Sequence, residues 1–208
     1  MDTITSLLAK SAANHNHLCP RQVLGVRIGM LAGKVLDLEL PQVDKRLFAF
    51  VECDGCGMGG ITVASGCCVD RRTMQILDFG KLAATFVDTK TGSSIRIHPH
   101  PEARISSGLY VSDEQSCWNN QLEAYQVMPA EELMVVQPVS LTVSLEKIIS
   151  RPGLRVDCSE CGEEITNERE VFINGQYLCR SCAGEAYFCY SRYDKDTNLS
   201  SQENIISV

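Results

Sequence analysis

Four cysteines near the C-terminal end stand in the spacing of a metal site. They form two Cys-x2-Cys pairs separated by a segment, "EVFINGQYL", that predicts a β-hairpin with Asn174 and Gly175 at its turn. A hairpin returns the second pair to the first, so the sequence predicts one structural tetrathiolate zinc site in a small zinc ribbon or treble clef. Its four ligands are Cys158, Cys161, Cys179 and Cys182.

The same four sulfurs leave other readings open. Iron could occupy them, and so could no metal at all, with free thiols or two disulfides in a loop-rich tail. Residues 157–190 carry seven acidic and two basic side chains, which is the wrong charge for a phosphate backbone. We therefore expect this module to contact protein or to support a dimer, and we expect no nucleic-acid partner.

A second group of candidate ligands lies near the N-terminus, in "HNHLCP". Residues two apart in an extended segment face the same side, so His15, His17 and Cys19 could approach one ion. Imidazole with thiolate favours a transition metal such as zinc, nickel or iron. Two or three ligands from one segment do not hold a metal tightly, and further ligands must come from elsewhere.

Two cysteine-bearing stretches could complete that site. "ECDGCGMGG" contains Cys53 and Cys56, and "ASGCC" contains Cys67 and Cys68. Residues 54–60 are predicted to be a loop, because Gly-Met-Gly-Gly is a poor helix start. Cys53 and Cys56 could also be a redox pair, although such pairs usually sit at a helix N-terminus.

These candidates must be positioned by helices and strands. Apolar spacing predicts helices over 3–13 and from Pro20 to about residue 39, and the row Gly25, Gly29 and Gly33 indicates either close approach of another backbone or a weak helix. Helix-led α+β order, without βαβ repeats, is the predicted class. Strands are predicted at 46–53, 73–80, 82–89 and 93–98, a helix at 112–127, a helical turn at 128–133 and an extended segment at 134–145.

The composition changes near residue 150. The predicted domains are an α+β domain at 1–150, a C4 module at 151–190 and a polar tail at 191–208. The chain of 208 residues has a net charge of −7 and 11 cysteines, an odd number that argues against a disulfide framework. Neither a signal peptide nor a membrane-spanning stretch is evident, so we expect a reduced, cytoplasmic protein with no membrane partner.

Several stretches occur together in one order: "HNHLCPRQVLGVRIGMLA", "VECDGCGMGGITVASGCC", "DFGKLAATFVD", and "PAEEL" followed by "CSECGE". This set resembles the FmdE family of formylmethanofuran dehydrogenase proteins over roughly residues 11–189. The resemblance implies a mixed sheet packed against long N-terminal helices, similar to the catalytic domain of glyceraldehyde phosphate dehydrogenases, and it implies a homodimer. It also implies a pocket with His17, Cys19, Cys56 and Cys67 as metal ligands, accompanied by Asp54 and Lys81.

The sequence departs from the family pattern at two positions. Gly59 and Thr62 stand where the resemblance implies Asp and Gln. The loss of a carboxylate from the pocket implies a different ligand or the lack of an activity.

Three functions remain as hypotheses. The first is a metal-binding accessory protein with structural zinc and a second transition metal, zinc, nickel or iron, in the His/Cys pocket. The second is an enzyme that acts on a small molecule, with Cys19 and Lys81 as candidate catalytic residues. The third is a regulatory protein whose C4 module contacts a partner protein.

Overall fold

The computed structural model describes residues 2–13, 15–111, 116–149 and 153–189. The chain divides into two compact units, one ending at Ser144 and the other beginning at Leu145. Within the described residues no helix is long and apolar enough to cross a membrane. The predicted polar tail at 191–208 lies outside the described residues, and so do the predicted domain junction at 150–151 and the first residues of the helix predicted at 112–127.

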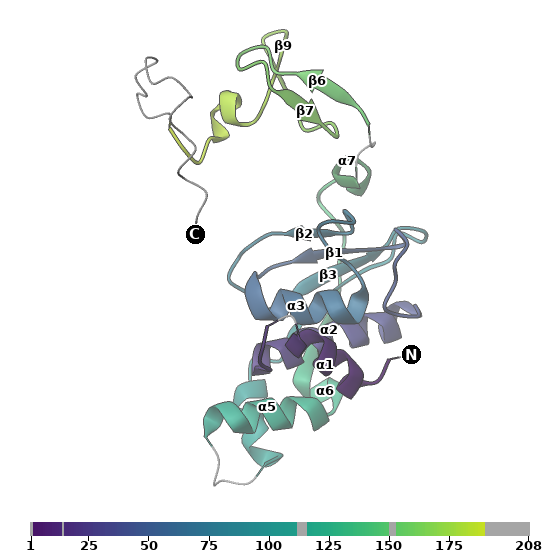
Figure 1. Ribbon diagram of the computed structural model, residues 1–208. Coiled ribbons are helices and arrows are strands. Elements are labelled where there is room, and N and C mark those ends of the chain that lie inside the picture. Colours follow the sequence, from purple (N-terminus) through teal and green to yellow (C-terminus); the bar gives the residue numbers. More distant parts are fainter. Residues whose placement is uncertain (1, 14, 112–115, 150–152, 190–208) are drawn as a thin grey trace. The chain divides into compact units, whose positions relative to one another are not determined.

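The N-terminal unit combines helices with one sheet, as Figure 1 shows. The helices are α1 (Ile4–Ala13), α2 (Pro20–Leu36), α3 (Gly55–Ser65), α4 (Ala103–Ser106), the 3-10 turn η1 (Ser107–Leu109), α5 (Cys117–Val127) and α6 (Ala130–Leu133). The strands are β1 (Leu47–Val51), β2 (Met74–Ile76), β3 (Ala84–Asp88), β4 (Ser94–Pro99) and β5 (Met134–Pro138). A strand is present within each segment predicted to be extended, and most are shorter than predicted because turns occupy the ends.

The sheet is mixed, in the order β2-β1-β3-β4-β5. β1 and β2 pair in parallel, while β1–β3, β3–β4 and β4–β5 pair antiparallel. A mixed sheet in an α+β order confirms the predicted class. The likeness to glyceraldehyde phosphate dehydrogenases stays a prediction.

The core lies between one face of this sheet and the helices. Alternate residues of β1, Leu47, Ala49 and Val51, are buried in one cluster with Val23 and Ile28 of α2. Direct cross-strand partners share a face, so Phe86 of β3, opposite Ala49, joins the same layer. Figure 1 shows α1, α2 and α3 together on this side of the sheet.

The glycine-rich stretch 54–60 is helical, and its prediction as a loop is wrong. α3 begins at Gly55, with Asp54 as its N-cap. A Cβ built on Gly60 would lie 2.4 Å from the carbonyl oxygen of Gln22, and one on Gly57 would lie 2.2 Å from a methyl of Leu82. Glycine costs about 1 kcal/mol in a helix interior, but here it permits contacts that any side chain would prevent.

The glycine row on α2 makes the close approach that its spacing allowed. A Cβ on Gly25 would lie 2.2 Å from the carbonyl oxygen of Gly57, and one on Gly29 would lie 2.6 Å from Ala64. Gly33 instead faces Leu40, which follows the helix. Contacts advance in the same direction along both helices, so α2 and α3 run parallel and their N-termini lie at the same end.

The C-terminal unit consists of short elements: α7 (Leu145–Ile149), β6 (Arg155–Asp157), β7 (Glu164–Thr166), β8 (Val171–Ile173), β9 (Gln176–Leu178) and the helical turn η2 (Ser181–Glu185). β6 pairs with β7 and β8 with β9, both antiparallel. Asn174 and Gly175 have φ of 51° and 82°, as a type I′ turn requires. The predicted hairpin is confirmed.

Candidate functional site

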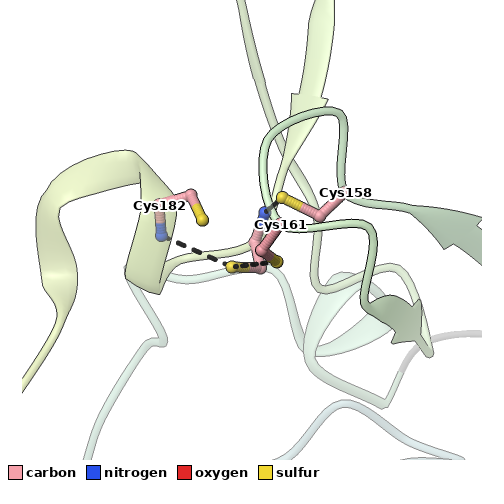
Figure 2. Close-up of side chains that lie close together, drawn as sticks. Cys158, Cys161 and Cys182 are labelled. Carbon is pink, nitrogen blue, oxygen red and sulfur yellow. Dashed lines mark hydrogen bonds between the residues drawn. The ribbon is translucent and has the colours of Figure 1, made fainter. Parts of the chain in front are cut away.

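The four C-terminal cysteines meet in one cluster. Cys158 and Cys161 lie in the turn after β6, Cys179 follows β9, and Cys182 lies on η2, as Figure 2 shows for the three that it labels. All four sulfurs lie within 4.8 Å of one another, and the Sγ atoms of Cys161 and Cys179 are 3.9 Å apart. A tetrahedral zinc with Zn–S bonds of about 2.3 Å separates its sulfurs by ~3.8 Å. The thiols therefore fit one ion.

Backbone amides also point at this cluster. The N–H of Cys179 donates to the sulfur of Cys158 at 3.2 Å, and the N–H of Cys182 donates to that of Cys179 at 3.4 Å. Amides of Cys161 and Cys179 lower the pKa of the Cys158 thiol to about 6, because they stabilise its thiolate. The neighbouring Cys179 raises the pKa of Cys182, since without a cation the thiols share protons.

The N-terminal site lies where α2 and α3 begin. Cys19 is the N-cap of α2 and is 8% exposed, and Cys56 is the second residue of α3. Burial, together with a hydrogen bond to Cys19, raises the pKa of the Cys56 thiol. Two parallel helices thus present their N-terminal dipole ends to one pair of adjacent thiols, an arrangement that favours thiolate over thiol once a cation compensates the desolvation.

Both N-terminal histidines border this pair. A Cβ on Gly59 would lie 3.3 Å from Nε2 of His15, so the imidazole of His15 rests on the second turn of α3. His17 is exposed, and its Nδ1–H donates to the carbonyl oxygen of His15 at 2.9 Å, which leaves Nε2 to carry the lone pair. Gly59 therefore leaves His15 uncovered at the position where the family resemblance implies Asp.

Cys67 is not brought to the other candidate ligands. It follows the C-terminal end of the eleven-residue α3, ~16 Å along the helix axis from its start. Its buried thiol donates to the carbonyl oxygen of Leu47 at 3.4 Å, and burial raises its pKa to about 11. Cys67 is a neutral core thiol in this structure and cannot share an ion with Cys56.

The remaining predicted site residues lie beside the thiol pair rather than on it. Thr62 faces β2, with its Oγ1 3.9 Å from the sulfur of Met74. Lys81 is exposed, and its backbone N–H donates to the carbonyl oxygen of Glu52 at 3.0 Å. In the described part of the chain no hydrogen bond or ion pair joins its ammonium to a thiol, so a catalytic role for Cys19 and Lys81 stays a prediction.

Sequence reasoning missed Gln22, which holds the N-terminal site in place. This side chain is fully buried, accepts from the N–H of Cys19 at 2.8 Å, and donates to the carbonyl and hydroxyl oxygens of Ser11 at 3.0 and 3.2 Å. It therefore links α1 to the N-cap of α2. A glutamine three residues after an N-cap position was the available signal.

Among the described residues, the C-terminal four are the one group of three or more His, Cys, Asp or Glu ligand atoms that already lie within 4.8 Å of one another. The N-terminal site brings two thiols together, with the histidines at its edge. A metal there would need an imidazole to turn inward.

Comparisons with known proteins divide the chain at the same place as its fold. A family model described as "FmdE, Molybdenum formylmethanofuran dehydrogenase operon" matches residues 14–135. A second, the prokaryotic dksA/traR C4-type zinc finger, matches residues 152–188 and thus covers all four clustered cysteines. The C-terminal module is therefore a C4-type zinc finger, and its thiols are suited to structural zinc.

Two individual proteins resemble the chain over nine-tenths of its length. One is a probable S-adenosyl-L-methionine-binding protein of Archaeoglobus fulgidus, 34% identical over 91% of this chain. The chain spans only 56% of that relative's length. The other is the crystal structure of an FmdE-like protein of tungsten formylmethanofuran dehydrogenase from Syntrophus aciditrophicus, with a TM-score of 0.57 at 21% identity, covering 90% of this chain and 96% of that one. This second likeness shows a shared fold.

Proposed function

The chain belongs to the FmdE family, and from that premise we propose that it is a metal-binding accessory protein whose N-terminal unit holds a transition metal in addition to the structural zinc. The observation that carries the proposal is the pairing of Cys19 and Cys56 at the adjoining N-termini of α2 and α3. Thiolate with imidazole selects zinc, nickel or iron over magnesium or calcium.

The proposed ligands are Cys19, Cys56 and His17. Nε2 of His17 is the ring nitrogen that remains available for a metal, because Nδ1 is engaged by the carbonyl of His15. A cation between the two sulfurs would offset the desolvation that raises the pKa of Cys56. Fewer than four protein ligands would leave a coordination position open, through which a small molecule could bind.

Metal analysis of the purified full chain tests this proposal. We expect about two metal equivalents per chain in the wild type, and the loss of one in Cys19→Ser and in Cys56→Ser, with the zinc of the C-terminal module retained. Cys67→Ser is the matched control, because this buried thiol lies at the other end of α3. Cobalt loading adds a thiolate-to-cobalt absorption band that the first two substitutions should weaken.

One zinc per chain in the wild type, unchanged by Cys19→Ser and Cys56→Ser after loading with zinc, nickel or cobalt, would refute the second metal site. Loss of the second metal in Cys67→Ser, but not in the other two variants, would place the site elsewhere.

A second candidate function follows from the Archaeoglobus relative, whose name indicates S-adenosylmethionine binding. We propose that this chain shares that ligand, since the identity extends over 91% of its residues. Isothermal titration with S-adenosylmethionine, and with S-adenosylhomocysteine as the control that lacks the sulfonium charge, tests it. Heat from neither compound at millimolar concentration would assign the relative's ligand to the part of that protein that this chain does not span.

Association is proposed in two forms. Three exposed apolar side chains of the α4–α5 region, Ile105, Leu109 and Val127, are 81%, 84% and 66% exposed and support a homodimer. On the acidic C4 module, the ring centroids of Phe172 and Tyr177 lie 4.9 Å apart on an exposed hairpin and support contact with a partner protein. Sedimentation of the full chain tests the first form: a monomer at all accessible concentrations would contradict the dimer.

The site of action is proposed to be the cytoplasm. Each of the 11 cysteines is a free thiol in the structure, and a reducing compartment keeps such thiols available for metal.

A further inference from the structure

The N-terminal unit contains a cavity that the thiol site does not use. Its volume is about 620 Å³, within the range of small-molecule sites. It lies beside the C-terminal half of α2, and its walls come from α1, α2, residues 37–40 and the α5–β5 region. Cys19 is at the opposite end of α2, ~25 Å along the helix axis.

The walls of this cavity are mainly apolar. Met30 and Leu31 of α2 contribute half-buried side chains, as do Ile4 of α1 and Leu40 of the following segment. The buried side chains of Leu7 and Leu38 lie deeper. A hydrocarbon or aromatic body would cover surface that these side chains otherwise expose to water.

Two carboxylates at the cavity have no ion-pair partner within the described ranges. Asp37 and Glu39 follow the last turn of α2, where the helix carbonyls add partial negative charge. Arg46, whose charge reaches Asp37, is held by both carboxylate oxygens of Asp88. The third acid, Asp2, is 2.6 Å from the ammonium of Lys10.

The two cations that line the cavity do not neutralise this edge. The guanidinium of Arg27 donates to three carbonyl oxygens, those of Tyr125, Gln126 and Met128, at 3.0, 3.1 and 2.6 Å. Its function is to anchor the end of α5 to α2. Lys34 is exposed on the last turn of α2, where an ammonium on a flexible stem extends into water.

We propose that this cavity binds a small organic cation with an apolar body. The body contacts Met30, Leu31 and Leu40, and the positive charge lies toward Asp37 and Glu39. The site is separate from the thiol pair and needs no metal, so it stands whether or not the N-terminal unit binds an ion.

The test uses three probes that share one body and differ only in charge: phenylbutylammonium, phenylbutanol and phenylbutanoate. Titration of the full chain, followed by amide chemical shifts, should show that the ammonium binds about fivefold more tightly than the alcohol, with the carboxylate weakest. The doubly substituted variant Asp37→Asn, Glu39→Gln should lose that preference and keep the affinity for the alcohol.

Cavity-filling variants locate the site. Met30→Trp and Ala130→Phe fill it from opposite walls, so at least one that folds, judged by circular dichroism, should lose all three probes. Cys19→Ser should bind them as the wild type does. Equal or tighter binding of the carboxylate, unchanged binding in both filled variants, or no binding at millimolar probe would overturn the proposal. Loss of a dimer in the filled variants, with no probe binding in the wild type, would assign the cavity to a contact between two copies.

Discussion

Asp88 is a buried carboxylate at the end of β3, 2% exposed, whose oxygens accept from Nε and Nη2 of Arg46 at 3.3 and 3.1 Å. This pairing lowers the pKa of Asp88 to about 2. A carboxyl whose pKa falls on folding stabilises the folded state above its unfolded pKa, near 3.9, and loses that contribution as the pH drops toward the folded value.

Substitution of Asp88 should therefore have an effect that depends on pH. We expect Asp88→Asn to lower the free energy of unfolding by about 1 to 2 kcal/mol between pH 5 and 7, with a smaller difference from the wild type at pH 2.5. Urea unfolding of both proteins at each pH measures this. A difference of the same size at pH 2.5 would mean that the loss comes from packing rather than from the charge of Asp88.

At the scale of elements, the glycine interface of α2 and α3 is what gives the N-terminal site its shape. Because the two helices run parallel in close contact, their first turns bring Cys19 and Cys56 together, and Gln22 fixes the N-cap from beneath. The site depends on a helix–helix distance that only glycines at the crossing allow.

A single added methyl should disturb this interface. In Gly60→Ala the Cβ would meet the backbone of α2 at 2.4 and 2.8 Å, atoms that cannot move independently of the helix. We expect a loss of about 2 kcal/mol or more in the free energy of unfolding, together with weaker metal binding at Cys19 and Cys56.

Gly108→Ala is the matched control, because nothing lies within 4 Å of a Cβ at that position. Its stability should stay within about 0.5 kcal/mol of the wild type. Thermal and urea unfolding of both variants make the comparison. A Gly60→Ala protein as stable as the control would show that α2 and α3 are farther apart than the structure has them.

At the scale of the whole molecule, the chain joins two units with different sources of stability. Residues up to Ser144 enclose an apolar core between sheet and helices. In the described part of the C-terminal unit, the residues buried below a tenth are Cys158 and Ile165. Such a module depends on its metal for most of its folding free energy.

Removal of zinc should accordingly unfold one unit and spare the other. We expect a chelator such as EDTA to collapse the amide resonances of residues 153–189 into the random-coil region, while those of the N-terminal unit keep their dispersion. Cys158→Ser should reproduce this without chelator. Loss of dispersion throughout the chain would show that the N-terminal unit relies on a metal as well.

The sequence by itself determined the zinc module, the helix–strand order and the family resemblance, because each rests on local spacing: Cys-x2-Cys pairs, Asn174–Gly175 at a turn, and apolar periodicity. Tertiary structure decided the rest. Propensity alone predicts a loop at residues 54–60, and they form α3 because close packing against α2 outweighs the cost of glycine. Cys67 was predicted as a ligand beside Cys56, yet the length of that same helix separates them, and the acidic, apolar cavity at the far end of α2 is formed by segments that no single stretch of sequence contains.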